Sequence, residues 1–109
     1  MVTYEVTATI DPDIADRYEQ YMQLRHVPDL LATGCFVRAS FSRSAPGRYR
    51  IRYEAPDQAT LDSYLARHAA ELREHVDREF PRGVVLSRET WTVLRSWEAR
   101  RDGPEGSES

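Results

Sequence analysis

The sequence contains no lysine, a single cysteine and no long hydrophobic run. All 15 basic residues are arginines, and with 18 acidic residues the formal net charge is −3. This weakly acidic balance argues against a nucleic-acid-binding protein, because such proteins usually carry a concentrated basic patch. The lone cysteine, Cys35, excludes a disulfide framework within the chain and fits a reducing compartment. We therefore expect a cytoplasmic protein with no nucleic-acid partner.

The apolar residues are too scattered for a membrane protein. No run approaches the roughly 20 residues that a membrane-spanning helix needs, and residues 1–10 lack the basic and apolar regions of a signal peptide. With 109 residues, 40% hydrophobic and 30% charged, the chain has the size and composition of one globular domain. We predict a single domain over residues 1–97, a disordered tail over 98–109 and no membrane contact.

Three segments alternate between apolar and polar residues with the period of two that is typical of a half-buried β-strand. They are residues 2–10, 35–43 and 48–54. A fourth strand is predicted over residues 84–94, which are rich in β-branched residues and include Trp91. In the first and third segments, Tyr4 and Tyr53 fall on the apolar face and Arg52 falls on the polar face. In the second segment the same pattern predicts that Val37 faces the core and that Phe36 lies opposite.

Two helical segments separate the strands. The first begins at Asp11-Pro12-Asp13, a capping sequence; Pro28 should kink it near His26-Val27, and Gly34 should end it. The second begins at Pro56-Asp57, runs as one helix with His68 in its apolar stripe, and ends at residues 80–83. Right-handed crossovers then place both helices on one face of the sheet. The sequence predicts an α+β, ferredoxin-like β-α-β-β-α-β fold with a four-stranded antiparallel sheet.

Short motifs are spread along most of the chain. They read Y-E-V-T at 4–7, H-V-P-D-L-L-A-T-G-C-F at 26–36, Y-L-A-R-H-A-A-E-L-R at 64–73 and R-E-F-P at 78–81. Over about residues 1–95 the chain resembles an uncharacterised bacterial family, domain of unknown function 4286. Its members open with Y-x-V-T and carry H-I-P-x-x-L-A-T-G-x-F after the first helix. They often have tryptophan where this chain has Tyr18 or Tyr21.

This resemblance implies a fold close to the dimeric α+β barrel proteins, such as those similar to antibiotic-biosynthesis monooxygenases. It implies no known activity. The wider fold includes cofactor-independent monooxygenases, haem-degrading enzymes and ligand-binding regulators, so the function has to be argued from the site itself.

His26 is the candidate catalytic residue. It stands at the expected proline kink, where helix carbonyl groups lose their partners, and a neutral imidazole there could act as a general base or bind a ligand. The alternative is structural: the imidazole donates to a freed carbonyl, such as that of Leu24, and fixes the kink. We favour this structural interpretation.

His68, Glu71 and His75 repeat at i, i+3 and i+7, which places them near one helix face. Imidazole and carboxylate groups bind zinc, but the chain has no CxxC or HExxH pattern, so we predict no metal site and no cofactor. Cys35 could be a nucleophile if a histidine activated it. A free cysteine more often behaves as a small buried hydrophobic residue, which is the interpretation we favour.

Aromatic and arginine side chains are the candidate ligand-binding groups. The predicted set is Tyr4, Arg52, Tyr53, His68 and Trp91. The aromatic members, together with Tyr64, should lie mostly in the core, and some could line a cleft between helices and sheet where their polar atoms find partners.

The polar sheet face allows three interpretations. Arg38, Arg50 and Arg52 could hold an anionic ligand, or this face could simply be solvated. The arginines could also pair with Glu5 and Glu54 across an interface between two copies. We favour a homodimer through this face. An RNA-recognition domain is excluded, because its strands expose aromatic residues where this chain has charged and hydroxyl side chains.

Three hypotheses remain. The first is a small dimeric domain that binds a small, partly apolar ligand or a partner protein. The second is a cofactor-independent enzyme of the monooxygenase or isomerase type, with His26 as the base in an aromatic cleft. The third is a purely structural dimer. The enzyme requires a polar-lined pocket that reaches His26, whereas a binding domain requires only a pocket or an exposed patch.

Overall fold

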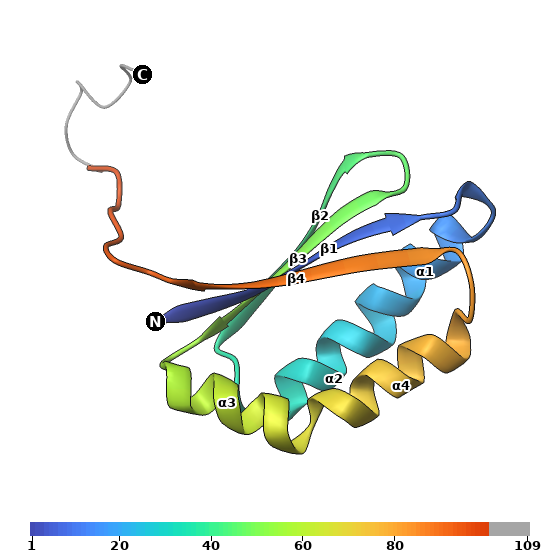
Figure 1. The fold of residues 1–109 in the computed structure, drawn as a ribbon. Helices are drawn as coiled ribbons and strands as arrows, with labels where there is room; N and C mark the ends of the chain where they lie inside the picture. Colours follow the sequence, from blue (N-terminus) through green and yellow to red (C-terminus); the bar gives the residue numbers. More distant parts are fainter. Residues whose placement is uncertain (101–109) are drawn as a thin grey trace.

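The chain forms, in this computed structural model, a twisted sheet with all its helices on one side (Figure 1). The structure describes residues 1–100, so most of the predicted tail, residues 101–109, lies outside the described part. The elements are β1 (Val2–Ile10), a 3-10 turn (Pro12–Ile14), α1 (Ala15–Tyr21), a π-helical turn (Met22–His26), α2 (Val27–Ala32), β2 (Arg38–Ala45), β3 (Arg48–Ala55), α3 (Gln58–Arg67), α4 (Ala69–Glu79) and β4 (Val84–Thr92).

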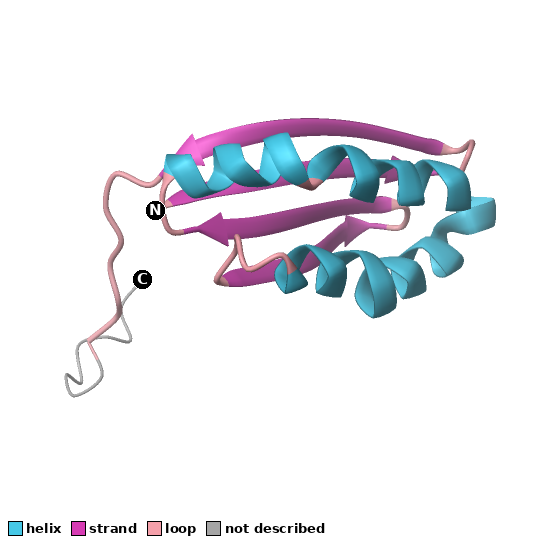
Figure 2. Ribbon diagram, turned by 90° about the horizontal axis from the view of Figure 1, so that it is seen from below, coloured by secondary structure: helices cyan, strands magenta, loops and turns pink. Residues whose placement is uncertain are grey.

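The strand order is β2-β3-β1-β4, and every neighbouring pair is antiparallel. Two helical arms, α1–α2 and α3–α4, run in opposite directions over the same side of the sheet and leave its other side uncovered (Figure 2). This arrangement confirms the predicted ferredoxin-like fold. Within residues 1–100, no helix is long and apolar enough to cross a membrane.

The core lies between the sheet and the helical arms, as the alternation predicts. Tyr4 pairs with Tyr53 and Val6 pairs with Ile51 across the central strands, and all four face the helices. Tyr53 is only 1% exposed, and Tyr18 and Tyr64 are similarly buried. The core is therefore unusually rich in tyrosines, whose hydroxyl groups need polar partners inside it.

The first helical arm bends at a π-helical turn rather than at a simple break. The backbone N–H of Val27 donates to the carbonyl of Met22, five residues earlier, directly before Pro28. Such a turn accommodates a proline that has no N–H to donate. The kink predicted near His26-Val27 is thus present, and Gly34 follows the arm with a φ of +79°.

Three predicted element details are wrong. The second helix is two helices, because the backbone of His68 leaves helical geometry between α3 and α4. The second strand begins at Arg38, after a bend in which Phe36 is buried (6% exposed) and Val37 is exposed (65%). The alternation of the sequence does not predict which of these side chains is buried, because both residues precede the hydrogen-bonded part of the strand. The fourth strand ends at Thr92 rather than at residue 94.

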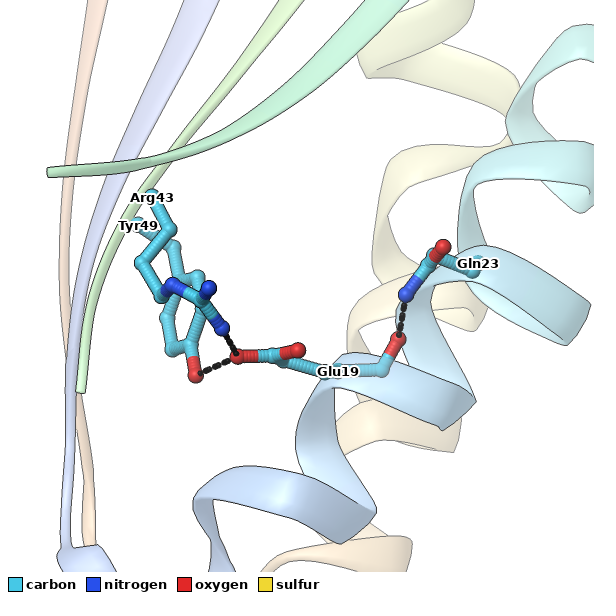
Figure 3. A network of polar contacts seen from close by, with 4 residues as sticks. All are labelled: Glu19, Gln23, Arg43 and Tyr49. Atoms are coloured by element: carbon cyan, nitrogen blue, oxygen red, sulfur yellow. Dashed lines mark hydrogen bonds and ion pairs between the residues drawn. The ribbon is translucent and has the colours of Figure 1, made fainter. Parts of the chain in front are cut away.

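A polar network ties α1 to the hairpin of β2 and β3 (Figure 3). Arg43 Nη1 and Tyr49 Oη donate to the same carboxylate oxygen of Glu19, at 2.8 and 2.6 Å. The hairpin itself turns at Gly47, where φ is +79° and a Cβ atom would lie 2.7 Å from the carbonyl oxygen of Ile10. Only glycine fits this position.

Candidate functional site

A small cavity lies between the helical arms and the sheet. Its volume is about 30 Å³, room for roughly two water molecules. Its apolar lining comprises Val6, Met22, Leu30, Ile51, Val76 and Leu86, together with the rings of Tyr18 and Tyr64. Its other lining residues are Tyr4, His26, Tyr53, Arg73, Asp77 and Arg88. The cavity is the place where buried polar groups of the two arms and the sheet converge.

Two of these polar groups have no partner. The hydroxyl of Tyr53 and Nε of Arg73 are buried and make no hydrogen bond within residues 1–100. The same guanidinium does donate from Nη2 to the hydroxyl of Tyr4, at 2.9 Å. Native proteins leave few buried polar atoms unpaired, and each one calls for an explanation such as a bound water or ligand.

The His26 ring lines the cavity and lies beside Tyr21, with ring centroids 6.5 Å apart. Burial lowers its pKa to about 4, an effect that Asp29 opposes and that Arg88 and His75 reinforce. His26 is therefore neutral at pH 7. Its ring makes no hydrogen bond within the described chain, so the predicted bond to a freed carbonyl is absent: the π-helical turn, not this side chain, holds the kink.

Arg73 and Arg88 are the site residues that the sequence interpretation missed. Arg73 lies on the buried stripe of α4, four residues after Ala69 and three before Val76. Arg88 follows Leu86 by two residues in β4, so both side chains point toward the helices. The sequence did contain an indication of both residues, because each arginine stands at a position where the periodicity of its helix or strand predicts an apolar residue.

The structure separates the predicted ligand-binding set. Tyr4 and Tyr53 line the cavity, and so does the candidate catalytic residue His26. Arg52 and Trp91 do not, because strand alternation places both on the uncovered sheet face, where Arg52 pairs with Glu5. The expectation that Trp91 is a core residue is wrong, since it is 50% exposed. His68 stacks on Tyr64 (6.3 Å) but lies outside the cavity.

The uncovered sheet face is mostly polar and partly paired. Arg52 Nε lies 3.6 Å from Oε2 of Glu5, and Arg38 Nη1 lies 4.0 Å from Oε1 of Glu54. Val85, 70% exposed, and Trp91 add apolar area at the β4 edge. This face therefore combines fixed charges with exposed apolar side chains.

The other candidate groups lie apart from one another. In the described part of the chain, no three His, Cys, Asp or Glu side chains cluster as metal ligands would. Cys35 is buried, and its Sγ lies 3.9 Å from the carbonyl oxygen of Thr33. The thiol thus packs as a small hydrophobic residue, as favoured from the sequence.

The sheet order, the one-sided helices and the cavity between them define a ferredoxin-like α+β domain. The profile of the domain of unknown function DUF4286 matches residues 1–94, so the chain belongs to this family. The resemblance seen in the motifs is thereby confirmed. No curated protein matches the chain.

Solved structures share this fold at low sequence identity. A dimeric ferredoxin-like protein from an uncultured marine organism is 9% identical, with a TM-score of 0.70 over 90% of this chain and 99% of that one. SnoaB, a cofactor-independent oxygenase from Streptomyces nogalater, is 15% identical, with a TM-score of 0.64 over 87% and 94%. The heme-degrader MhuD from Mycobacterium tuberculosis is 9% identical, with a TM-score of 0.67 over 90% and 100%.

Proposed function

We propose that this protein binds a small, partly apolar organic molecule in the cavity between its helices and its sheet. The observation that carries this proposal is the pair of unpartnered groups at one cavity, the hydroxyl of Tyr53 and Nε of Arg73. A buried polar atom without a partner costs about 1–3 kcal/mol. A ligand with hydrogen-bonding atoms removes that cost, and the surrounding aromatic and aliphatic side chains accommodate its apolar part.

The cavity has to widen to admit such a ligand. Its volume of about 30 Å³ is well below the roughly 150 Å³ of a cavity that binds benzene. The π-helical turn supplies two wall residues, Met22 and His26. Such turns occur often at functional sites, and methionine adapts its shape easily. A shift of this turn admits the ligand.

A cofactor-independent oxygenase acting on the bound molecule is the second candidate function. It is favoured by the position of His26 in the cavity wall and by the oxygenase activity of the fold neighbour SnoaB. A general base works best when its pKa lies near the working pH, whereas the pKa of His26 is about 4. Ligand binding is therefore the better supported of the two functions.

We also propose that the protein is a cytoplasmic homodimer that associates through the uncovered sheet face. The dimeric fold neighbour supports this proposal, as do the exposed Val85 and Trp91 on that face. The single buried cysteine fits a reducing location.

A titration tests the binding function. Backbone ¹H–¹⁵N spectra are recorded with increasing phenol, benzyl alcohol, benzoate and indole. We expect at least one of these probes to cause saturable shifts that centre on the cavity, and Tyr53→Phe to weaken that binding. The matched control is Tyr49→Phe, which removes a tyrosine hydroxyl outside the cavity and leaves the affinity unchanged. Absence of saturable cavity shifts with all four probes contradicts the proposal.

A further inference from the structure

The charges around the cavity are unbalanced. Two guanidinium groups, Arg73 and Arg88, line it together with one carboxylate, Asp77. The ion pairs of residues 1–100 involve other residues, so neither cavity arginine has a salt-bridge partner there. His26 adds no charge, because burial keeps its imidazole neutral at pH 7. The charged residues that line the cavity therefore sum to one positive charge at neutral pH, and only Arg73 among them is half-buried, whereas Asp77 and Arg88 are exposed.

The unpartnered groups are also of one kind. Nε of Arg73 carries an N–H that can only donate a hydrogen bond. Tyr53 keeps its proton, because burial raises the pKa of its hydroxyl, so this group also has a proton to donate. The bond from Arg73 to Tyr4 uses Nη2 and leaves the Nε–H free. Within residues 1–100, neither of these two donors has an acceptor within hydrogen-bond distance.

We infer that the natural ligand carries a carboxylate or another acidic oxygen, which accepts hydrogen bonds from Arg73 Nε and the Tyr53 hydroxyl. This inference rests on the proposed binding function and adds the chemical class of the ligand. A neutral carbonyl or a water also accepts hydrogen bonds, but leaves the positive charge of the half-buried Arg73 uncompensated. An anion satisfies the donors and the charge together. It also makes the hydrogen bond from the neutral Tyr53 hydroxyl charge-assisted, and such bonds are about twice as strong as neutral ones. The apolar lining holds the rest of the ligand, which points to an aromatic or aliphatic acid.

The test compares two probes of similar size, benzoate and benzyl alcohol, which differ in charge. The signal followed is the Arg73 side-chain Nε–H, assigned by its loss in Arg73→Leu. We expect benzoate to shift this signal and to bind about tenfold more tightly than benzyl alcohol, the ratio for a difference of about 1.4 kcal/mol. Arg73→Leu should remove that preference.

Each remaining outcome has a distinct meaning. If both probes bind the cavity equally, the ligand class is wrong and the binding function stands. If neither binds while phenol or indole does, the ligand class is likewise wrong; if none of the four binds, the proposed function itself fails. Should Arg73→Leu not fold, Arg73→Lys takes its place, since it keeps the positive charge and removes the Nε donor. A benzoate affinity unchanged in Arg73→Lys would overturn the assignment of Nε.

Discussion

The hydroxyl of Tyr49 on β3 donates a 2.6 Å hydrogen bond to the carboxylate of Glu19 on α1. Arg43 on β2 donates to the same oxygen at 2.8 Å. The bond from Tyr49, and then that from Arg43, lower the pKa of Glu19 below its ordinary value of 4.5. One ionised carboxylate therefore links the first helical arm to the hairpin, and none of these three residues lines the cavity.

This link predicts an acid-sensitive contribution to stability. Because the pKa of Glu19 is lower in the folded protein, its contribution is fully present above pH 4.5 and is lost as the pH falls through the folded value. Urea unfolding measured between pH 7 and pH 3 should show that Glu19→Gln is less stable than the parent protein at pH 7. The difference should shrink toward pH 3. A difference that is constant over this range contradicts the prediction.

Tyr53→Phe should stabilise the protein while it weakens ligand binding. The substitution removes a buried hydroxyl that has no partner in the unliganded structure, and we expect a gain of about 1 kcal/mol in the free energy of unfolding. Tyr49→Phe is the matched control, and its expected effect on the free energy of unfolding has the opposite sign. It removes a hydroxyl bonded to a carboxylate and should cost about 1–2 kcal/mol. An equal loss of unfolding free energy in the two variants would show that the hydroxyl of Tyr53 already has a hydrogen-bond partner.

His26 should make stability depend on pH in a higher range. Its pKa is about 4 in the folded protein and 6.5 ordinarily, so the unfolded chain binds more protons between these values. The free energy of unfolding should then fall by about 2 kcal/mol as the pH drops from 6.5 to 4, once the partial exposure of His26 is allowed for, and should level off below pH 4. His26→Gln should lack this slope. An NMR titration with a His26 midpoint near 6.5 contradicts the account.

The dimer can be tested by charge reversal on the uncovered sheet face. Arg50→Glu combined with Arg52→Glu should give a monomer, because both side chains project from β3 into the proposed interface. Size-exclusion chromatography with light scattering measures the mass. The matched control is Arg67→Glu with Arg78→Glu, an equal charge change on the exposed side of the second helical arm. An unchanged elution volume for the β3 variant rules out this interface.

Most of the fold could be predicted because the sequences of β1 and β3 alternate and each helical arm begins with a capping aspartate, Asp11 or Asp57. It was harder to predict which side chains of β4 face the helices, since Val84 and Val85 are neighbours and both are apolar. The pairing of Ile10 with Val84 decides it and turns Trp91 outward. Local pattern also gave no sign that the backbone of His68 would interrupt the second helix.

The site could be predicted only in part. Tyr4 and Tyr53 follow from the strand period, and His26 from the proline next to its turn. Arg73 and Arg88 were missed because an arginine within an apolar stripe can also extend its stem across the core and reach solvent. Only the three-dimensional fold brings these two residues, one from α4 and one from β4, to the same cavity.

The central claim is that the cavity holds a small organic acid, and native mass spectrometry of the protein purified from its own host tests it most directly. The account predicts a non-covalent adduct of one small acidic molecule per chain, absent from Arg73→Leu purified in the same way. A bare polypeptide mass under gentle ionisation, the same for the parent protein and the variant, would contradict it.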